Sequence, residues 1–215
     1  MNQSDVVILK PTAVFMSFLT TEFPDAVIPD LSELKADSTA YTIFKHDSDE
    51  ATLQEVERHF PAMFKHEIYR AIGAQIAHDV EVSFLDFLCC FKFEVHSQIV
   101  VMESSLNHGQ QLLRVKPRSV LLTWMKKSCD DQIDVSEALR HMNISHLTEN
   151  ATVLVKNFQH TTDVQPFIQN YYRPIFKAEM LRICDAATPW PDIESFETFN
   201  RYFAVELHTQ LVHLH

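Results

Sequence analysis

The chain has 215 residues, with 29 acidic against 18 basic residues and a formal net charge of −11, and only two of its residues are glycine. Glycine permits positive φ and lets a phosphate approach main-chain N–H groups closely. Gly73 and Gly109 alone cannot supply a P-loop, a dinucleotide-binding fingerprint or the elbow around a nucleophilic serine. The usual motifs of nucleotide-dependent enzymes and serine hydrolases are therefore excluded, and no motif is diagnostic of a function.

The composition is that of a folded domain, because 46% of the residues are hydrophobic and sixteen are Phe. The first apolar stretch, 6–9, follows Asp5 and is too short for a signal sequence, and no run of apolar residues could span a membrane. The four cysteines form no C-x-x-C pair. We therefore expect a cytoplasmic protein with free thiols, without a zinc or disulfide framework and without membrane insertion.

The charge is unevenly distributed along the chain. Residues 21–57 contain ten acids against Lys35 and Lys45, whereas residues 110–128 contain bases and no acid. The acids of the first segment are Glu22, Asp25, Asp30, Glu33, Asp37, Asp47, Asp49, Glu50, Glu55 and Glu57, and the basic patch of the second is Arg114, Lys116, Arg118, Lys126 and Lys127. Two solvated surfaces explain this pattern most simply, and an acidic surface also favours a basic partner.

In the first half we expect strands at 6–9 and 41–44 and a helix from Pro11 to Phe23. A capping box of Asp47 and Glu50 predicts a helix that Pro61 interrupts and that continues to about His78. Alternating apolar residues predict strands within 80–84, 91–95 and 99–102. A further strand at 112–115 is expected to pair with the preceding one across the turn at 107–109.

The second half is expected to be mainly helical, with helices at 119–127, 134–142 and 164–184, the last broken or kinked at Pro174. Phe196, Phe199, Phe203, Leu207, Leu211 and Leu214 predict an amphipathic C-terminal helix. No internal repeat is apparent. We predict an α+β fold with a small antiparallel sheet in about 80–115, as one domain over 1–185 followed by a linker and the C-terminal helix over 186–215.

The order of elements in 49–127 resembles that of bacterial histone-like DNA-bending proteins: two helices, hairpin strands and a basic helix. Those proteins have a glycine-bearing turn before the first strand and a long basic arm. Here the corresponding stretch is 84–88, without glycine, and the loop at 103–111 has no Lys or Arg. The resemblance implies a possible shape for less than half of the chain and is not evidence of DNA binding.

Aromatic residues in the second half are candidates for partner binding. The C-terminal stripe has the spacing of a helix that docks in a groove, and Tyr and Arg are enriched at binding hot spots. Packing into the protein's own core is the simpler role for these side chains, and partner binding is the alternative. The candidates are Tyr171, Tyr172, Arg173, Trp190, Phe196, Phe199 and Phe203.

Three hypotheses about function stay open. The first is a non-enzymatic interaction protein, an adaptor, secretion-type chaperone or assembly subunit, that needs no cofactor and binds a basic or apolar segment of another protein. The second is a metal-dependent enzyme with ligands scattered in sequence, for which Asp134, Glu137 and His141 share one face of a predicted helix. The third is a nucleic-acid-associated protein that uses the basic patch. Homo-oligomerisation also stays open.

Overall fold

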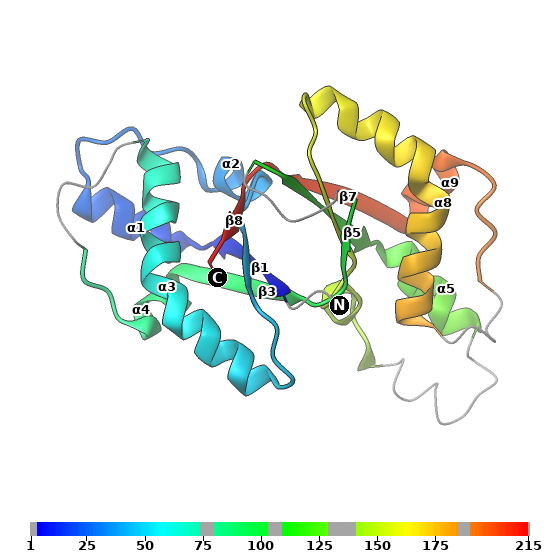
Figure 1. The fold of residues 1–215 in the computed structure, drawn as a ribbon, viewed down its shortest axis with the longest axis horizontal. Coiled ribbons are helices and arrows are strands. Elements are labelled where there is room, and N and C mark those ends of the chain that lie inside the picture. Colours follow the sequence, from blue (N-terminus) through cyan, green and yellow to red (C-terminus); the bar gives the residue numbers. More distant parts are fainter. Residues whose placement is uncertain (1–3, 74–79, 103–108, 129–140, 185–189, 215) are drawn as a thin grey trace. The chain divides into compact units, whose positions relative to one another are not determined.

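The computed structural model describes residues 4–73, 80–102, 109–128, 141–184 and 190–214. It confirms the α+β class, with two four-stranded sheets that are each packed against helices (Figure 1). The chain divides into two compact units. Unit 1 comprises Met1–Ser97, Asn107–Gln110 and His208–His215, and unit 2 comprises Gln98–Leu106 and Gln111–Leu207. This division differs from the predicted single domain over 1–185.

Unit 1 contains a sheet of strand order β3-β1-β2-β8, in which β8 runs parallel to β2 and the other neighbours are antiparallel. Alternate residues of β1, Val7 and Leu9, pack under helices with Phe15, Phe64 and Phe87 in one apolar core. The elements are β1 (Ser4–Pro11), α1 (Ala13–Glu22), α2 (Leu31–Ala36), β2 (Ala40–Phe44), α3 (Asp49–Ile72), α4 (Phe84–Cys90), β3 (Phe91–His96) and β8 (Leu211–His213).

Unit 2 contains a sheet of strand order β4-β6-β5-β7, in which β4 runs parallel to β6 and β5 is antiparallel to β6. Its core joins Leu113 and Val115 of β5 to Phe176, Phe199 and Phe203. The elements are β4 (Ile99–Val101), β5 (Gln111–Pro117), α5 (Ser119–Ser128), α7 (Ile144–Thr148), β6 (Val153–Lys156), the 3-10 helix η1 (Thr161–Asp163), α8 (Val164–Ile183), α9 (Phe196–Tyr202) and β7 (Phe203–His208).

The two units have the same topology. Strands β3, β1, β2 and β8 of unit 1 correspond in order to β7, β5, β6 and β4 of unit 2; in both sheets the central pair is antiparallel and the pair with β8 or β4 is parallel. In each unit the parallel edge strand is supplied by the other half of the chain, because β4 follows β3 in sequence and β8 follows β7. The chain is therefore a tandem duplication of one α+β unit with exchanged edge strands.

The sequence carries the same duplication, so the expectation of no internal repeat was wrong. Residues 83–100, SFLDFLCCFKFEVHSQIV, align with 195–212, SFETFNRYFAVELHTQLV, with Ser, three Phe, Glu, His, Gln and Val in common. Residues 64–70, FKHEIYR, align with 176–182, FKAEMLR. Fixed-period patterns of the kind used to detect short repeats miss a pair of copies that are each about a hundred residues long.

Residues shared by the repeats form the same internal contacts in both units. Glu67 is fully buried and binds Arg70 (Oε2 to Nη2, 2.7 Å), and Glu179 is fully buried and binds Arg182 (2.8 Å). Each arginine also donates to main-chain carbonyls that surround the short helix before the second strand, which satisfies groups that α2 and α7 leave open. These acceptors are Leu34 and Asp37 in unit 1 and Leu147 and Glu149 in unit 2.

The C-terminal helix predicted through Leu214 is wrong beyond Tyr202, where α9 ends and β7 and β8 follow. Apolar residues four positions apart lie on one face of a helix, but residues an even number of positions apart also lie on one face of a strand. Phe203, Val205 and Leu207 alternate with less apolar residues and pack on the core of unit 2. Edge pairing in the sheets therefore decides the structure here, and periodicity alone could not.

Three further expectations from the first half were wrong. No strand forms at 80–84, because Ser83 caps α4 and its hydroxyl accepts from the N–H of Asp86. No hairpin joins 99–101 to 111–117, since β4 pairs with β6 and β6 lies between β4 and β5. Helix α3 ends at Ile72 rather than near His78 and starts from Ser48, and Pro61 lies within this helix, as Pro174 lies within α8.

Candidate functional site

The exposed face of α4 differs in chemistry from that of its counterpart α9. Phe87 and Cys90 of α4 point into the core, which leaves Leu85, Leu88 and Cys89 on the outer face. Leu85 is 71% exposed and Leu88 is 37% exposed. The aligned positions of α9 carry Glu197, Asn200 and Arg201. The fold therefore accepts polar residues at these positions, and the apolar face of α4 needs another explanation.

The first turn of α1 lies beside the end of α4 and carries a further exposed apolar residue. Thr12 donates its hydroxyl proton to the carbonyl of Cys89 (2.8 Å), which places the start of α1 beside the end of α4. Val14, two residues on, is 51% exposed. We define the docking face as Val14, Leu85, Leu88 and Cys89.

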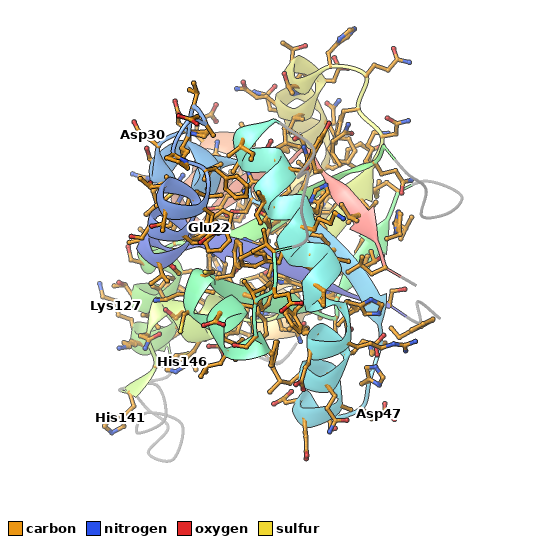
Figure 2. All side chains as sticks on the ribbon, turned by 90° about the vertical axis from the view of Figure 1, so that its left-hand side faces the viewer. Glu22, Asp30, Asp47, Lys127, His141 and His146 are labelled. Carbon is orange, nitrogen blue, oxygen red and sulfur yellow. The ribbon has the colours of Figure 1, made fainter. Side chains whose placement is uncertain are left out.

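One acidic side chain lies on α4 itself, and further exposed acids lie elsewhere on unit 1. On α4 the Asp86 carboxylate accepts from the backbone N–H (3.0 Å) and the hydroxyl (2.6 Å) of Ser83, and these hydrogen bonds lower the pKa of Asp86, so it stays ionised at neutral pH. Glu22, the last residue of α1, is exposed as well, and Figure 2 shows it with Asp30 and Asp47, which belong to two other segments of unit 1. Of the ten acids in 21–57, only Asp37 and Glu55 are not exposed.

A separate hollow of about 380 Å³ lies in unit 1 where the loop before α3 meets the ends of β1 and β3. Its walls combine acidic groups with apolar side chains, and Leu53 at its rim is 41% exposed. The lining residues are Asp5, His46, Asp47, Ser48, Asp49, Thr52, Leu53, Phe93, Val95 and Ser97.

Asp5 is the deepest charged group of this hollow, with 1% of its surface exposed. Its carboxylate accepts hydrogen bonds from the main chain of His46 and the side chain of Ser97, but its Oδ1 has no hydrogen-bond partner among the described residues. Burial raises the pKa of Asp5 above its ordinary value, against the opposing effect of Ser97, Lys45 and His46. An ionised carboxylate with an unsatisfied oxygen is costly inside a protein and often marks a functional position.

Unit 2 has a neutral amide at the position that Asp5 holds in unit 1. Gln111 aligns with Asp5, and its Oε1 accepts from the N–H of Phe158 (2.7 Å), the same bond that Asp5 forms with His46. Nearby, unit 1 contains Glu55 beside His46 and His59, with 3.1 Å between Glu55 Oε1 and His59 Nε2. At the aligned positions unit 2 packs three aromatic rings together, those of Phe158, Phe167 and Tyr171.

A second polar cluster of unit 1 surrounds Tyr41, whose hydroxyl donates to Glu67 Oε1 (2.8 Å). The hydroxyl carries one proton, so the 3.0 Å contact to His66 Nδ1 requires that His66 is the donor there. Burial lowers the pKa of His66, and burial together with Glu67 raises the pKa of Tyr41. In unit 2 the aligned residues are Leu154 and Ala178, so this cluster also belongs to unit 1 alone.

The aromatic residues predicted to bind a partner lie in unit 2, and several form its interior. Phe199 and Phe203 are fully buried and stack on each other, 5.5 Å between centroids. Tyr172 packs against Phe196 and Phe199, and Trp190 lies edge-on to Phe176. Tyr171 and Arg173 are exposed. The structure thus joins most of these residues in one apolar core rather than on one surface.

The predicted basic patch is also divided. Arg114 is fully buried and binds Glu206, which also binds Lys116 at 2.9 Å. The guanidinium of Arg118 donates to the carbonyl of Phe203. Lys126 and Lys127 are exposed at the end of α5, where Figure 2 shows Lys127. The nucleic-acid hypothesis, which depends on these five residues, stays a prediction.

The metal candidates Asp134 and Glu137 lie outside the described residues, and His141 is exposed (Figure 2). Within the described ranges, no three or more His, Cys, Asp or Glu residues are arranged to hold a metal ion. Cys89, Cys90 and Cys184 are free thiols, and Cys129 is not described. Burial raises the pKa of Cys90 to about 11, which keeps it protonated.

Over the part of the chain that the structure describes, no helix is both long and apolar enough to cross a membrane. Comparison with protein-family models, curated proteins and solved structures finds no match to this chain. The internal repeat is therefore the relevant comparison. Sequence reasoning missed Asp5, Leu85 and Leu88, and the signal that finds them is their difference from Gln111, Glu197 and Asn200.

Proposed function

We propose that this chain is a non-enzymatic interaction protein, an adaptor, chaperone or assembly subunit, and that unit 1 binds an amphipathic basic helix of another protein. The observation that carries the proposal is the contrast between α4 and α9. Leu85 and Leu88 are exposed in one copy of the repeat, whereas the other copy has Glu197 and Asn200 at those positions. Burial of one leucine side chain contributes about 1.5–3 kcal/mol. Burial of both Leu85 and Leu88 against a partner can therefore stabilise a complex.

The spacing of the docking face favours a helical partner. Leu85, Leu88 and Cys89 are related by three and four positions, and so form one narrow stripe along α4. A stripe of this kind packs against the apolar side of a second helix, as in helix-in-groove recognition. The partner segment needs apolar residues at the same spacing.

The charge around the docking face favours a basic partner. Asp86 carries negative charge on α4 itself, and the whole chain has a formal net charge of −11. Lys or Arg on the flank of the partner helix would meet Asp86 at the rim of the interface. Such rim charges mainly raise the association rate and exclude acidic partners.

The test is a binding titration of the full chain against a fluorescently labelled amphipathic peptide of leucine and lysine, followed by anisotropy. We expect saturable binding that weakens about tenfold or more in the Leu85→Gln/Leu88→Asn variant, which removes apolar contacts without changing the charge. Val14→Ser should also weaken binding. Val120→Ser is the matched control, because Val120 holds the equivalent position in α5 and is 46% exposed.

Two peptide controls separate docking from general electrostatic attraction. A peptide of the same composition with a scrambled order has the same charge but no apolar stripe, and a leucine–glutamate peptide has the stripe with the opposite charge. Equal binding of the scrambled peptide, or equal effects of the Val14 and Val120 substitutions, would contradict the proposal. A measured affinity that is unchanged in Leu85→Gln/Leu88→Asn would do so as well.

A further inference from the structure

The carboxylate of Asp5 is not required by the fold. Gln111 holds the aligned position in unit 2 and makes the equivalent hydrogen bond to the main chain through a neutral amide. Unit 2 therefore shows that a neutral side chain can form the hydrogen bond between the first strand and the loop after the second strand. The charge at Asp5 is a property of unit 1, and it sits in a low-dielectric setting where it costs stability unless a cation balances it.

The geometry of the hollow indicates what could balance that charge. Asp5 lines the hollow and is 1% exposed. Its Oδ1 has no hydrogen-bond partner among the described residues. Asp47 and Asp49 add two carboxylates to the same walls, and Leu53, Phe93 and Val95 add apolar surface. The volume of about 380 Å³ lies within the range of about 300–1,000 Å³ that is typical of small-ligand pockets.

We propose that this hollow binds an alkylguanidinium or alkylammonium group, with the cationic head on Asp5 and the alkyl stem along Leu53, Phe93 and Val95. The chemistry is that of an arginine or lysine side chain and equally of a free alkylamine. A carboxylate near apolar surface suits a cation on an apolar stem, because such side chains combine a charged head with an apolar body. The site is independent of the docking face on α4.

The opposite charge class is unsuited to the same walls. An anion would meet Asp5, Asp47 and Asp49, with Lys45 and His46 as the neighbouring basic groups. A metal ion would need several ligands converging on one point, and among the described residues no group of three or more has that arrangement. A monovalent organic cation needs one well-placed carboxylate and contact area for its stem, both of which are present.

The probes for the test are n-butylguanidinium, n-butylammonium, the neutral analogue butylurea and a capped arginine peptide, each titrated into the full chain by calorimetry. We expect both small cations to bind saturably and butylurea not to bind. Asp5→Asn keeps the hydrogen-bond acceptor, as Gln111 does, and should weaken cation binding about tenfold or more. Asp192→Asn, the same charge change at an exposed position of unit 2, should leave the affinity unchanged.

The outcomes distinguish the sources of the cation and the two proposals. Tighter binding of the peptide than of the small cations assigns the hollow to a protein side chain, and equal or weaker binding assigns it to a free amine. Unchanged butylguanidinium affinity in Leu85→Gln/Leu88→Asn keeps this site apart from the docking face. Binding of no cationic probe, or equal affinity in Asp5→Asn and the native chain, overturns the inference.

Discussion

Glu67 and Glu179 are the same residue of a duplicated unit, each fully buried and each bound to the arginine three positions later in its helix. Both arginines continue to main-chain carbonyls near the short helix that precedes the second strand. One ion pair thus fixes a helix, a loop and a sheet in each unit. A carboxylate with no exposed surface is stable only with such a partner.

We predict that Arg70→Met lowers the free energy of unfolding of unit 1 by about 3–5 kcal/mol, because it leaves the buried Glu67 charge unpaired. Arg182→Met should do the same to unit 2. The double variant Glu67→Gln/Arg70→Met removes both charges and should recover part of the loss. The measurement is urea unfolding with hydrogen exchange assigned to each unit.

Hydrogen exchange tells where each loss occurs. Faster exchange in β1 and β2 for Arg70→Met, and in β5 and β6 for Arg182→Met, is the expected pattern. A loss of similar size in the double variant would mean that packing of the arginine stem, and not the ion pair, supports the loop.

Local sequence patterns were sufficient for the strands within β1, β2, β3, β4 and β5 and for helices α1 and α5, because alternation and helical periodicity describe short segments. They were insufficient for the C-terminus, where Phe203, Leu207 and Leu211 fit a helix and a strand equally well. The pairing of Ala40 with Leu211 decides that segment, and this contact joins opposite ends of the chain. No local pattern contains such information.

The candidate site was harder to predict than the fold. Phe199 and Phe203 have the spacing of a helix that docks in a groove, yet they are buried, since apolar aromatic side chains serve cores and interfaces alike. Leu85 directly follows the stretch 80–84, in which alternation favours a strand, and Asp5 enters only the argument against a signal sequence. The acidic surface of 21–57 could be predicted because charged side chains are rarely buried without a partner.

We predict that Asp5→Asn is at least as stable as the native chain at neutral pH. Burial raises the pKa of Asp5, so the folded state binds this proton more tightly than the unfolded chain does, and stability falls as the pH rises through the interval above the ordinary value of 3.8. The variant lacks this loss. Its advantage should shrink as the pH is lowered from 7 to about 4, measured as the difference in urea midpoint between the two proteins.

The comparison uses the difference between the two proteins at each pH, because other ionisable side chains lie near Asp5, namely Lys45, His46, Asp47 and Asp49. A variant that is less stable at pH 7 by an amount independent of pH would mean that the charge of Asp5 is already compensated. That result would also weaken the case for a cationic ligand.

We predict that iodoacetamide labels Cys89 and leaves Cys90 unmodified in the folded protein at pH 8. Cys89 is exposed, whereas Cys90 is buried and has its pKa raised to about 11, which lowers its thiolate fraction about a hundredfold. Mass spectrometry of the fragmented peptide distinguishes the adjacent residues, and Cys89→Ser is the control. The leucine–lysine peptide should slow the labelling of Cys89 if α4 is the docking face, and unchanged labelling with bound peptide would place the peptide elsewhere.

The exchanged edge strands predict that substitutions at equivalent positions act on opposite units. Leu214 donates its N–H to the carbonyl of Thr42 (3.1 Å), and Met102 donates its N–H to the carbonyl of Val155 (2.9 Å). Proline removes the donor, so each substitution should cost its unit about 1–3 kcal/mol. Leu214→Pro should therefore loosen unit 1, to which residues 208–215 belong, although it lies at the far end of the sequence.

Met102→Pro should instead loosen unit 2, because β4 follows unit 1 in sequence but completes the sheet of unit 2. Hydrogen exchange then shows faster exchange in β1 and β2 for Leu214→Pro and in β5 and β6 for Met102→Pro. If each substitution instead loosened the unit that precedes it in sequence, the edge strands would not be exchanged. Each half of the chain depends on the other for one strand, and so neither repeat is expected to complete its sheet alone.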